Sequence, residues 1–218
     1  MKHVITYPGF AEGLSAKGLF TDLRNTYSDK YEFHILPFYE EMPGGDRVVH
    51  SISEHRNTVQ EYMDSLDGEI TILGKCGGSR VVVDLDDEHL ARVDAMALFN
   101  PPWAVSRSRL EARFEGWEGS RRPDGSWVIP RDSDRGYVIT PEYMKDASSM
   151  SMMDRYRRIA RSATKFFIVR GMKDEVIPNI RVDRIEGAVP IDIVDGNHHL
   201  TGPARALVIS ALAKYAVL

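Results

Sequence analysis

The sequence of 218 residues has only one cysteine, Cys76, and it has no long hydrophobic run. A single cysteine excludes a disulfide within the chain, which is typical of proteins from a reducing compartment. Residues 1–8 enter a strand-like run directly, without the apolar stretch of a signal peptide, and no later stretch approaches the length of a membrane span. We therefore expect a cytoplasmic protein that has no membrane partner.

Nucleic-acid-binding motifs, internal repeats and low-complexity tracts are also missing from the sequence. The hydrophobic fraction of 43% and the charged fraction of 28% are ordinary for a globular protein, and the formal net charge is −4. A chain of this length suits a single domain with one sizeable core. We expect a small-molecule partner rather than a nucleic acid, and no metal or cofactor.

Short apolar runs alternate with segments that have a helical pattern along most of the chain. The apolar runs are continuous, which is typical of strands buried on both faces of a parallel sheet. This alternation predicts a doubly wound α/β fold with a mostly parallel sheet of about six strands. The expected strands are residues 3–7, 31–36, 69–73, 94–99, 165–169 and 190–194, and the expected helices are residues 16–27, 51–66, 78–90, 148–163 and 203–216.

Segment 101–147 interrupts this alternation and is too long for a simple connection. It is rich in arginine and contains all three tryptophans of the chain, Trp103, Trp117 and Trp127. We predict that it is an insertion after the fourth strand, which folds over the strand ends as a small lid of a single domain, residues 1–218. The alternative is a surface excursion that serves only packing. Its arginines suit either an anionic substrate or a solvated face whose charges pair locally.

Gly74-Lys75-Cys76-Gly77-Gly78 lies between the third predicted strand and the helix that follows it. It is a thiol version of the G-x-S-x-G nucleophile elbow, in which the residues two before and two after the nucleophile must be small. The N-terminus of a helix behind Cys76 would also favour negative charge on its sulfur. The pentapeptide predicts a nucleophilic cysteine, and a buried cysteine in an ordinary glycine turn is the alternative.

Candidate partners for this nucleophile follow two later strands, where the catalytic groups of an α/β sheet lie. Asp174 follows the fifth strand, with Glu175 as the neighbouring alternative carboxylate. His198 and His199 lie on a glycine-containing loop before the last helix. A metal pair is the weaker interpretation, since adjacent histidines on extended chain point apart and no further ligands complete a set. The order Cys, Asp, His favours a nucleophile, an acid and a base.

The turn after the first strand, Tyr7-Pro8-Gly9-Phe10, is the candidate for half of an oxyanion hole. A glycine turn at this point would aim the backbone N–H of Phe10 at the region above Cys76. The N–H of Gly77, directly after the nucleophile, would be the second donor. A plain strand-end turn is the alternative.

These motifs together resemble the α/β-hydrolase superfamily over nearly the whole chain. Residues 8–10 (PGF) resemble its H-G-[FG] oxyanion loop with a proline where histidine is usual, and residues 74–78 resemble its elbow. Residues 171–178 (GMKDEVIP) resemble its G-x-x-D-x-[VI]-[VI]-P acid loop, and residues 196–200 (GNHHL) are similar to its G-[DN]-H-x-[FL] base loop. Residues 140–144 (TPEYM) resemble the strand-to-helix passage that returns from its lids. The resemblance implies Asp174 as the acid and favours His198 over His199 as the base.

The main departure from the family pattern is Cys76, where serine is usual. Dienelactone hydrolases in the same superfamily use a Cys-His-Asp triad. A cysteine introduced in place of a native serine would give the same sequence as a native cysteine. The resemblance implies an esterase-like or thioesterase-like hydrolase that acts on an ester, thioester or lactone through an acyl-enzyme on Cys76. Two alternatives stay open: an acyltransferase or cyclase, in which a nucleophile other than water resolves the acyl-enzyme, and a protein of this fold that binds a ligand without turnover.

Overall fold

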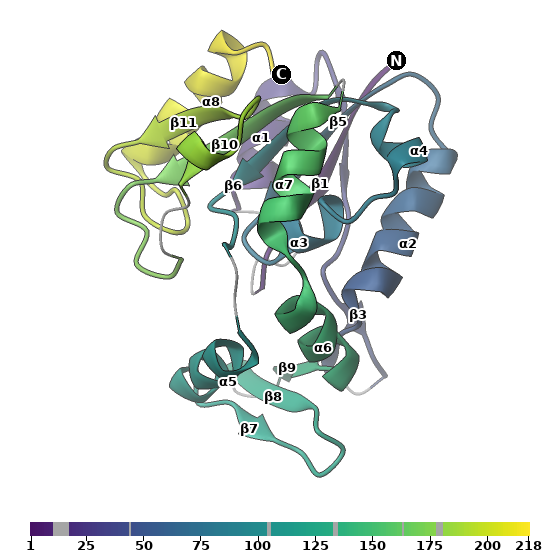
Figure 1. Cartoon of the computed structure of the whole chain (residues 1–218), viewed down its shortest axis with the longest axis vertical. Coiled ribbons are helices and arrows are strands. Elements are labelled where there is room, and N and C mark those ends of the chain that lie inside the picture. The colour runs from purple at the N-terminus through teal and green to yellow at the C-terminus, as the bar shows by residue number, and fades with distance from the viewer. Residues whose placement is uncertain (11–17, 44, 104–105, 133–134, 163, 178–180) are drawn as a thin grey trace.

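The computed structural model describes residues 1–10, 18–43, 45–103, 106–132, 135–162, 164–177 and 181–218. Its largest element is a six-stranded sheet with the order β11-β10-β6-β5-β1-β2, in which every pairing is parallel (Figure 1). The predicted α/β fold with a mostly parallel sheet is therefore confirmed. The strands are β1 (Lys2–Tyr7), β2 (Glu32–Ile35), β5 (Glu69–Lys75), β6 (Val93–Phe99), β10 (Lys165–Gly171) and β11 (Val189–Ile193).

Helices cover both faces of this sheet, which explains why its strands are apolar without alternation. Successive residues of a strand point to opposite faces, and Ile72 and Leu73 of β5 accordingly belong to two different core clusters. One cluster includes α1 (Leu19–Tyr27) and α8 (Pro203–Lys214). The other includes α2 (Ile52–Asp64), α3 (Gly78–Val82), α4 (Asp87–Leu90) and α7 (Met152–Arg161). No helix in the described ranges has the length and apolarity that crossing a bilayer requires.

Two of the predicted helices differ from the observed ones. The helix expected over residues 78–90 is two short helices, because Asp86 accepts a hydrogen bond from the N–H of His89 and so begins α4 as a new helix. The helix expected over residues 148–163 is divided between the end of α6 (Pro141–Ser149) and α7. The first two residues of the helix expected over 16–27 lie outside the described residues. A one-turn 3₁₀ helix, η1 (Val182–Arg184), precedes β11.

A second sheet, which sequence patterning did not predict, lies beyond the main sheet (Figure 1). Its order is β3-β4-β9-β8-β7, and the β4–β9 pair is parallel whereas the others are antiparallel. Its first two strands precede α2, and the other three belong to segment 101–147. The elements are β3 (Glu40–Glu41), β4 (Arg47–Val49), β7 (Ser120–Arg121), β8 (Trp127–Asp132) and β9 (Arg135–Ile139), with α5 (Arg107–Gly116) alongside. We call α5, β7, β8, β9 and α6 the cover.

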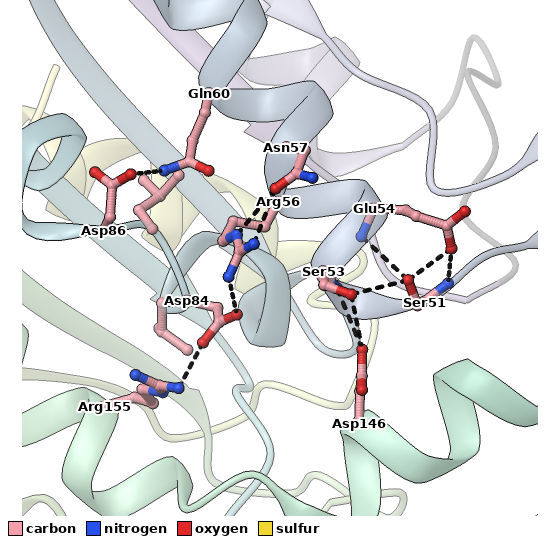
Figure 2. Close-up of polar contacts among 12 residues, drawn as sticks. Ser51, Ser53, Glu54, Arg56, Asn57, Gln60, Asp84, Asp86, Asp146 and Arg155 are labelled. Atoms are coloured by element: carbon pink, nitrogen blue, oxygen red, sulfur yellow. Dashed lines mark hydrogen bonds and ion pairs between the residues drawn. The ribbon is translucent and has the colours of Figure 1, made fainter.

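Polar contacts attach α6 and α7 to the helices of the main sheet (Figure 2). Asp146 of α6 accepts hydrogen bonds from the N–H and the hydroxyl of Ser53 in the first turn of α2, both at 3.3 Å. Arg155 of α7 pairs with Asp84 at 2.8 Å, and the same carboxylate pairs with Arg56 of α2 at 3.4 Å. These contacts hold α6 and α7 against α2 and the turn after α3.

Candidate active site

Cys76 lies on the sharp turn between β5 and α3, and its backbone has a φ of 46°. A non-glycine residue in this left-handed region is strained and persists only where its surroundings hold it. Its N–H donates to the carbonyl of Phe99 at 3.0 Å. Side chains would collide at both flanking glycines: a Cβ on Gly74 would lie 2.7 Å from a Val82 methyl, and one on Gly78 would lie 2.2 Å from the carbonyl oxygen of Pro8. The turn therefore has the backbone of a nucleophile elbow.

The loops after β10 and β11 bring Asp174 and His198 together. Nδ1 of the imidazole lies 2.9 Å from Oδ2 and 3.1 Å from Oδ1 of the carboxylate. Oδ1 also accepts hydrogen bonds from the N–H groups of Val176 and Ile177, both at 2.8 Å. Burial raises the pKa of Asp174, but the hydrogen bonds from His198 and from these two N–H groups outweigh burial and hold its pKa below the ordinary value. Asp174 is thus a buried, ionised carboxylate that accepts a hydrogen bond from Nδ1 of the imidazole.

The side chain of Cys76 also lies close enough to the His198 imidazole to affect its pKa. Burial lowers the pKa of His198, but the hydrogen bonds to Asp174 and Cys76 and the charges of both partners raise it more, to about 9. The imidazole is therefore protonated at neutral pH. A protonated imidazole beside a sulfur is the arrangement that activates nucleophilic cysteines. The structure thus brings Cys76, His198 and Asp174 together: His198 is hydrogen-bonded to Asp174, and the sulfur lies within electrostatic range of the imidazole.

The two alternative residues occupy different places. Glu175 accepts a hydrogen bond from the backbone N–H of His198 at 3.3 Å, so it supports the loop rather than the imidazole. The ring of His199 stands nearly perpendicular to that of His198, with 5.2 Å between the centroids. Of the two histidines, His198 is the one that the structure joins to Asp174.

Asn100 braces the two loops that carry these groups, a role that the sequence analysis missed. It follows β6 with a φ of 44° and is buried. Its Oδ1 accepts from the N–H of Gly171 at 2.6 Å, and its Nδ2 donates to the carbonyl of His198 at 2.9 Å. The sequence could have indicated Asn100, because it directly follows the fourth predicted strand and residues at the carboxyl ends of strands lie at the site in α/β sheets.

The turn after β1 lies against Cys76, as the oxyanion-hole hypothesis requires. A Cβ on Gly9 would lie 2.8 Å from the Cβ of Cys76 and 3.4 Å from the backbone nitrogen of Gly77. A Cβ on Gly77 would in turn lie 3.2 Å from the ring of Phe10. Within the described residues, the N–H groups of Phe10 and Gly77 make no hydrogen bond to a backbone carbonyl outside helices and strands. The turn that carries Phe10 therefore packs directly against the elbow that carries Gly77.

A cavity of about 30 Å³ opens beside Cys76 and Gly77. Leu110, Phe114 and Trp117 of the cover form its apolar side. Trp117 is the only one of the three tryptophans that lines it; the ring of Trp127 packs behind, 5.8 Å from that of Phe114. The cover therefore contributes directly to the walls around the sulfur.

Three polar residues that the sequence analysis did not single out also line this cavity: Arg80 of α3, Arg113 of α5 and Tyr143 of α6. Only the arginine-rich composition of the insertion hinted at Arg113. Arg80 lies four residues after Cys76, so a helix that begins at the elbow returns its side chain toward the nucleophile. In the sequence, Tyr143 was part of the predicted strand-to-helix passage over residues 140–144. The structure confirms this passage, because Thr140 caps α6 directly after β9.

Two other features of the described residues lie away from Cys76. A cavity of about 490 Å³ is lined by Asp84, Asp146 and Arg155, whose charged groups already have partners (Figure 2). His3, Glu32 and His34 could together hold a metal ion, but they lie on β1 and β2, and none of them lines the cavity beside Cys76. Neither feature supplies a group to the site at Cys76.

No protein-family model matches this sequence, and no curated protein matches it. Solved structures match it in fold. The esterase EaEST from Exiguobacterium antarcticum has a TM-score of 0.69 at 13% identity, over 99% of this chain and 91% of its own. Est1E from Butyrivibrio proteoclasticus has a TM-score of 0.68 at 14% identity, over 99% and 86%. Alpha/beta hydrolase domain-containing protein 10 from mouse has a TM-score of 0.65 at 15% identity, over 98% and 89%.

The chain has the α/β-hydrolase fold. In this chain, Cys76 lies on the turn between β5 and α3. Asp174 lies on the loop after β10, and His198, which is hydrogen-bonded to Asp174, lies on the loop after β11. An arrangement of nucleophile, base and orienting acid at the carboxyl ends of parallel strands can transfer an acyl group.

Proposed function

We propose that this protein is a hydrolase that cleaves a small ester, thioester or lactone through an acyl-enzyme on Cys76. The observation that carries the proposal is the strained elbow at Cys76, with the hydrogen-bonded pair of His198 and Asp174 close enough for the sulfur to affect the pKa of the imidazole. Esterases among the solved structures of this fold support the same reaction class. No metal or cofactor is needed for these steps.

In the first half-reaction, His198 holds the proton of the Cys76 thiol and the sulfur attacks the substrate carbonyl carbon. The N–H groups of Phe10 and Gly77 stabilise the negative charge that develops on the carbonyl oxygen. When the tetrahedral intermediate collapses, the bond to the leaving group breaks and His198 gives the leaving group its proton. Asp174 keeps the imidazole oriented and stabilises its charged form throughout. The product of this step is a thioester on Cys76.

In the second half-reaction, water takes the place of the leaving group. Neutral His198 removes a proton from the water as its oxygen attacks the thioester carbon, and the same two N–H groups hold the oxyanion. The carbon–sulfur bond then breaks, the carboxylic acid leaves, and the proton on His198 again pairs with the sulfur. We propose that segment 101–147 acts as the lid of this site, since Leu110, Phe114 and Trp117 close one side of the cavity.

Alkylation provides a direct test because Cys76 is the only thiol in the chain. Iodoacetamide should add one group to the protein and abolish hydrolysis of activated esters and thioesters, with both changes following the same time course. Intact-protein mass spectrometry measures the first change and product absorbance the second. Cys76→Ala is the matched control, which should neither be labelled nor turn over substrate.

Full ester hydrolysis by the alkylated protein would show that Cys76 is not the nucleophile. Mass spectrometry of the products, with and without an added amine, would separate a hydrolase from a transferase. An amide product that replaces the acid would assign the second half-reaction to a nucleophile other than water.

A further inference from the structure

Arg80 is a buried cation without a counter-ion. Only 2% of the residue is exposed, and its Nη1 donates to the carbonyl of Ala147 in α6 at 3.0 Å. That is the single hydrogen bond that its side chain makes within the described residues, and no carboxylate there lies within ion-pair distance. A buried charge of this kind is costly unless it is paired. The cavity beside Cys76, which Arg80 lines, is where a partner can reach it.

Arg113, on α5 of the cover, lines the same cavity. Its Nη2 donates to the carbonyl of Val176 at 2.7 Å, and it too has no carboxylate partner among the described residues. Other arginines nearby do have one: Arg107 of the same helix pairs with Glu111 at 3.0 Å. Arg109 of the same helix has no carboxylate partner among the described residues either, but it is exposed to solvent, whereas Arg113 is half-buried at the cavity.

The hydroxyl of Tyr143 completes a polar wall. The residue is buried, lines the cavity and makes no side-chain hydrogen bond within the part of the chain that the structure describes. Burial raises the pKa of Tyr143 far above its ordinary value, and the positive charges of Arg80 and Arg113 oppose this rise, while Cys76 adds to it. Both guanidinium groups and the sulfur thus lie within electrostatic reach of this hydroxyl.

We propose that Arg80, Arg113 and Tyr143 bind a carboxylate of the substrate beside the nucleophile. The proposal rests on the proposed function, and it names the substrate class: a small ester, thioester or lactone that carries a carboxylate close to the scissile carbonyl, such as a half-ester of a short dicarboxylic acid. Guanidinium groups match the two oxygens of a carboxylate with paired N–H donors. A cavity of about 30 Å³ restricts the bound group to a short one.

The first test needs no turnover. Iodoacetate and iodoacetamide alkylate the same sulfur and are nearly equal in size, but only iodoacetate carries a carboxylate. The ratio of their second-order rate constants at Cys76 should exceed the ratio for glutathione at the same pH. In Arg80→Gln the ratio should fall by about 10- to 100-fold, because a hydrogen bond to a charged group is lost. Arg113→Gln should also lower this ratio of rate constants.

Arg109→Gln is the matched control, because it removes the same charge from α5 at an exposed position. It should leave the ratio unchanged. Circular dichroism shows whether Arg80→Gln folds, and Arg113→Gln decides the question if it does not. A wild-type ratio no greater than that of glutathione, or equal ratios in the wild type and in both cavity variants, would overturn the carboxylate site.

The second test compares two esters that share an acyl chain: 4-nitrophenyl hydrogen glutarate, with a free carboxylate, and its neutral methyl ester. The wild type should have the higher kcat/KM for the anionic ester, and Arg80→Gln should reduce this preference by about 10- to 100-fold. A preference that is equal in the two proteins would contradict the proposal. If neither ester is hydrolysed but the alkylation ratio behaves as expected, the proposed hydrolysis fails and the carboxylate site stands.

Discussion

The two halves of the site are built in different ways. Cys76, Asp174 and His198 lie on loops that follow β5, β10 and β11 of one parallel sheet, and backbone hydrogen bonds tie these loops together, such as that from Lys173 N–H to the carbonyl of Gly196 at 2.9 Å. The opposite half comes from the cover. Its strands are short, and the pairing of β9 with β4 joins them to the part of the chain before α2. The three candidate catalytic residues thus lie on loops of the sheet, whereas residues of the cover line the cavity beside Cys76.

The largest effect should come from the sheet half. Asp174→Asn keeps the shape of the acid but removes the charge that orients and stabilises the His198 imidazolium. We expect kcat/KM to fall by about 10²- to 10⁴-fold, with little change in KM. Steady-state kinetics on a neutral activated ester measures this effect.

The matched control for Asp174→Asn is Glu175→Gln, because among the described residues that carboxylate is hydrogen-bonded to the backbone N–H of His198 and not to its imidazole. Glu175→Gln should lower kcat/KM by less than about 10-fold. If the two variants lost activity equally, Asp174 would have no special role in orienting the imidazole.

A pair of glycine substitutions compares the packing of the two halves. In Gly78→Ala the new methyl group would lie 2.2 Å from the carbonyl oxygen of Pro8, so α3 or the turn after β1 must move. We expect the free energy of unfolding to fall by about 3 kcal/mol or more. Gly116→Ala, at the end of α5 in the cover, meets no atom within 4 Å and should stabilise the protein by up to about 1 kcal/mol. Urea unfolding measures both, and similar values for the two variants would refute the difference in packing.

The smallest effect is the pH dependence of stability that His198 contributes. Its pKa is raised from 6.5 to about 9 in the folded protein, so the folded state binds the proton more tightly than the unfolded chain. This stabilisation is complete below about pH 6.5 and is lost as the pH rises through about 9, and it amounts to at most about 3 kcal/mol. The free energy of unfolding of the wild type should therefore decline over this range.

The decline should be absent from His198→Gln and retained in His199→Gln, when urea unfolding is followed at about pH 6 and about pH 9.5. The same slope in the wild type and in His198→Gln would mean that another group is responsible.

Sequence patterning predicted the sheet half well because its signals are local. Continuous apolar runs identify strands that are buried on both faces, and the small residues around Cys76 reflect collisions that the structure measures directly at Gly74 and Gly78. Asp174 and His198 were found by the same logic, since each follows a strand.

Segment 101–147 was predicted as an insertion, but the second sheet was not, because its strands have two to six residues and its pairings join distant parts of the chain. In β4 and β9, for example, Val49 pairs with Ile139, which no local pattern reveals. A strand as short as β3 or β7 has too few residues to show a period.

By itself, the sequence determined the parallel sheet, the turn at Cys76 and the order of the three candidate catalytic residues, because strand burial and turn geometry act over a few neighbouring residues. Only the tertiary structure decided that His198 rather than His199 meets Asp174, and that Arg80, Arg113 and Tyr143 share one cavity with the sulfur. Those three side chains come from three different helices, and a charge without a counter-ion becomes visible only when everything packed around it is known.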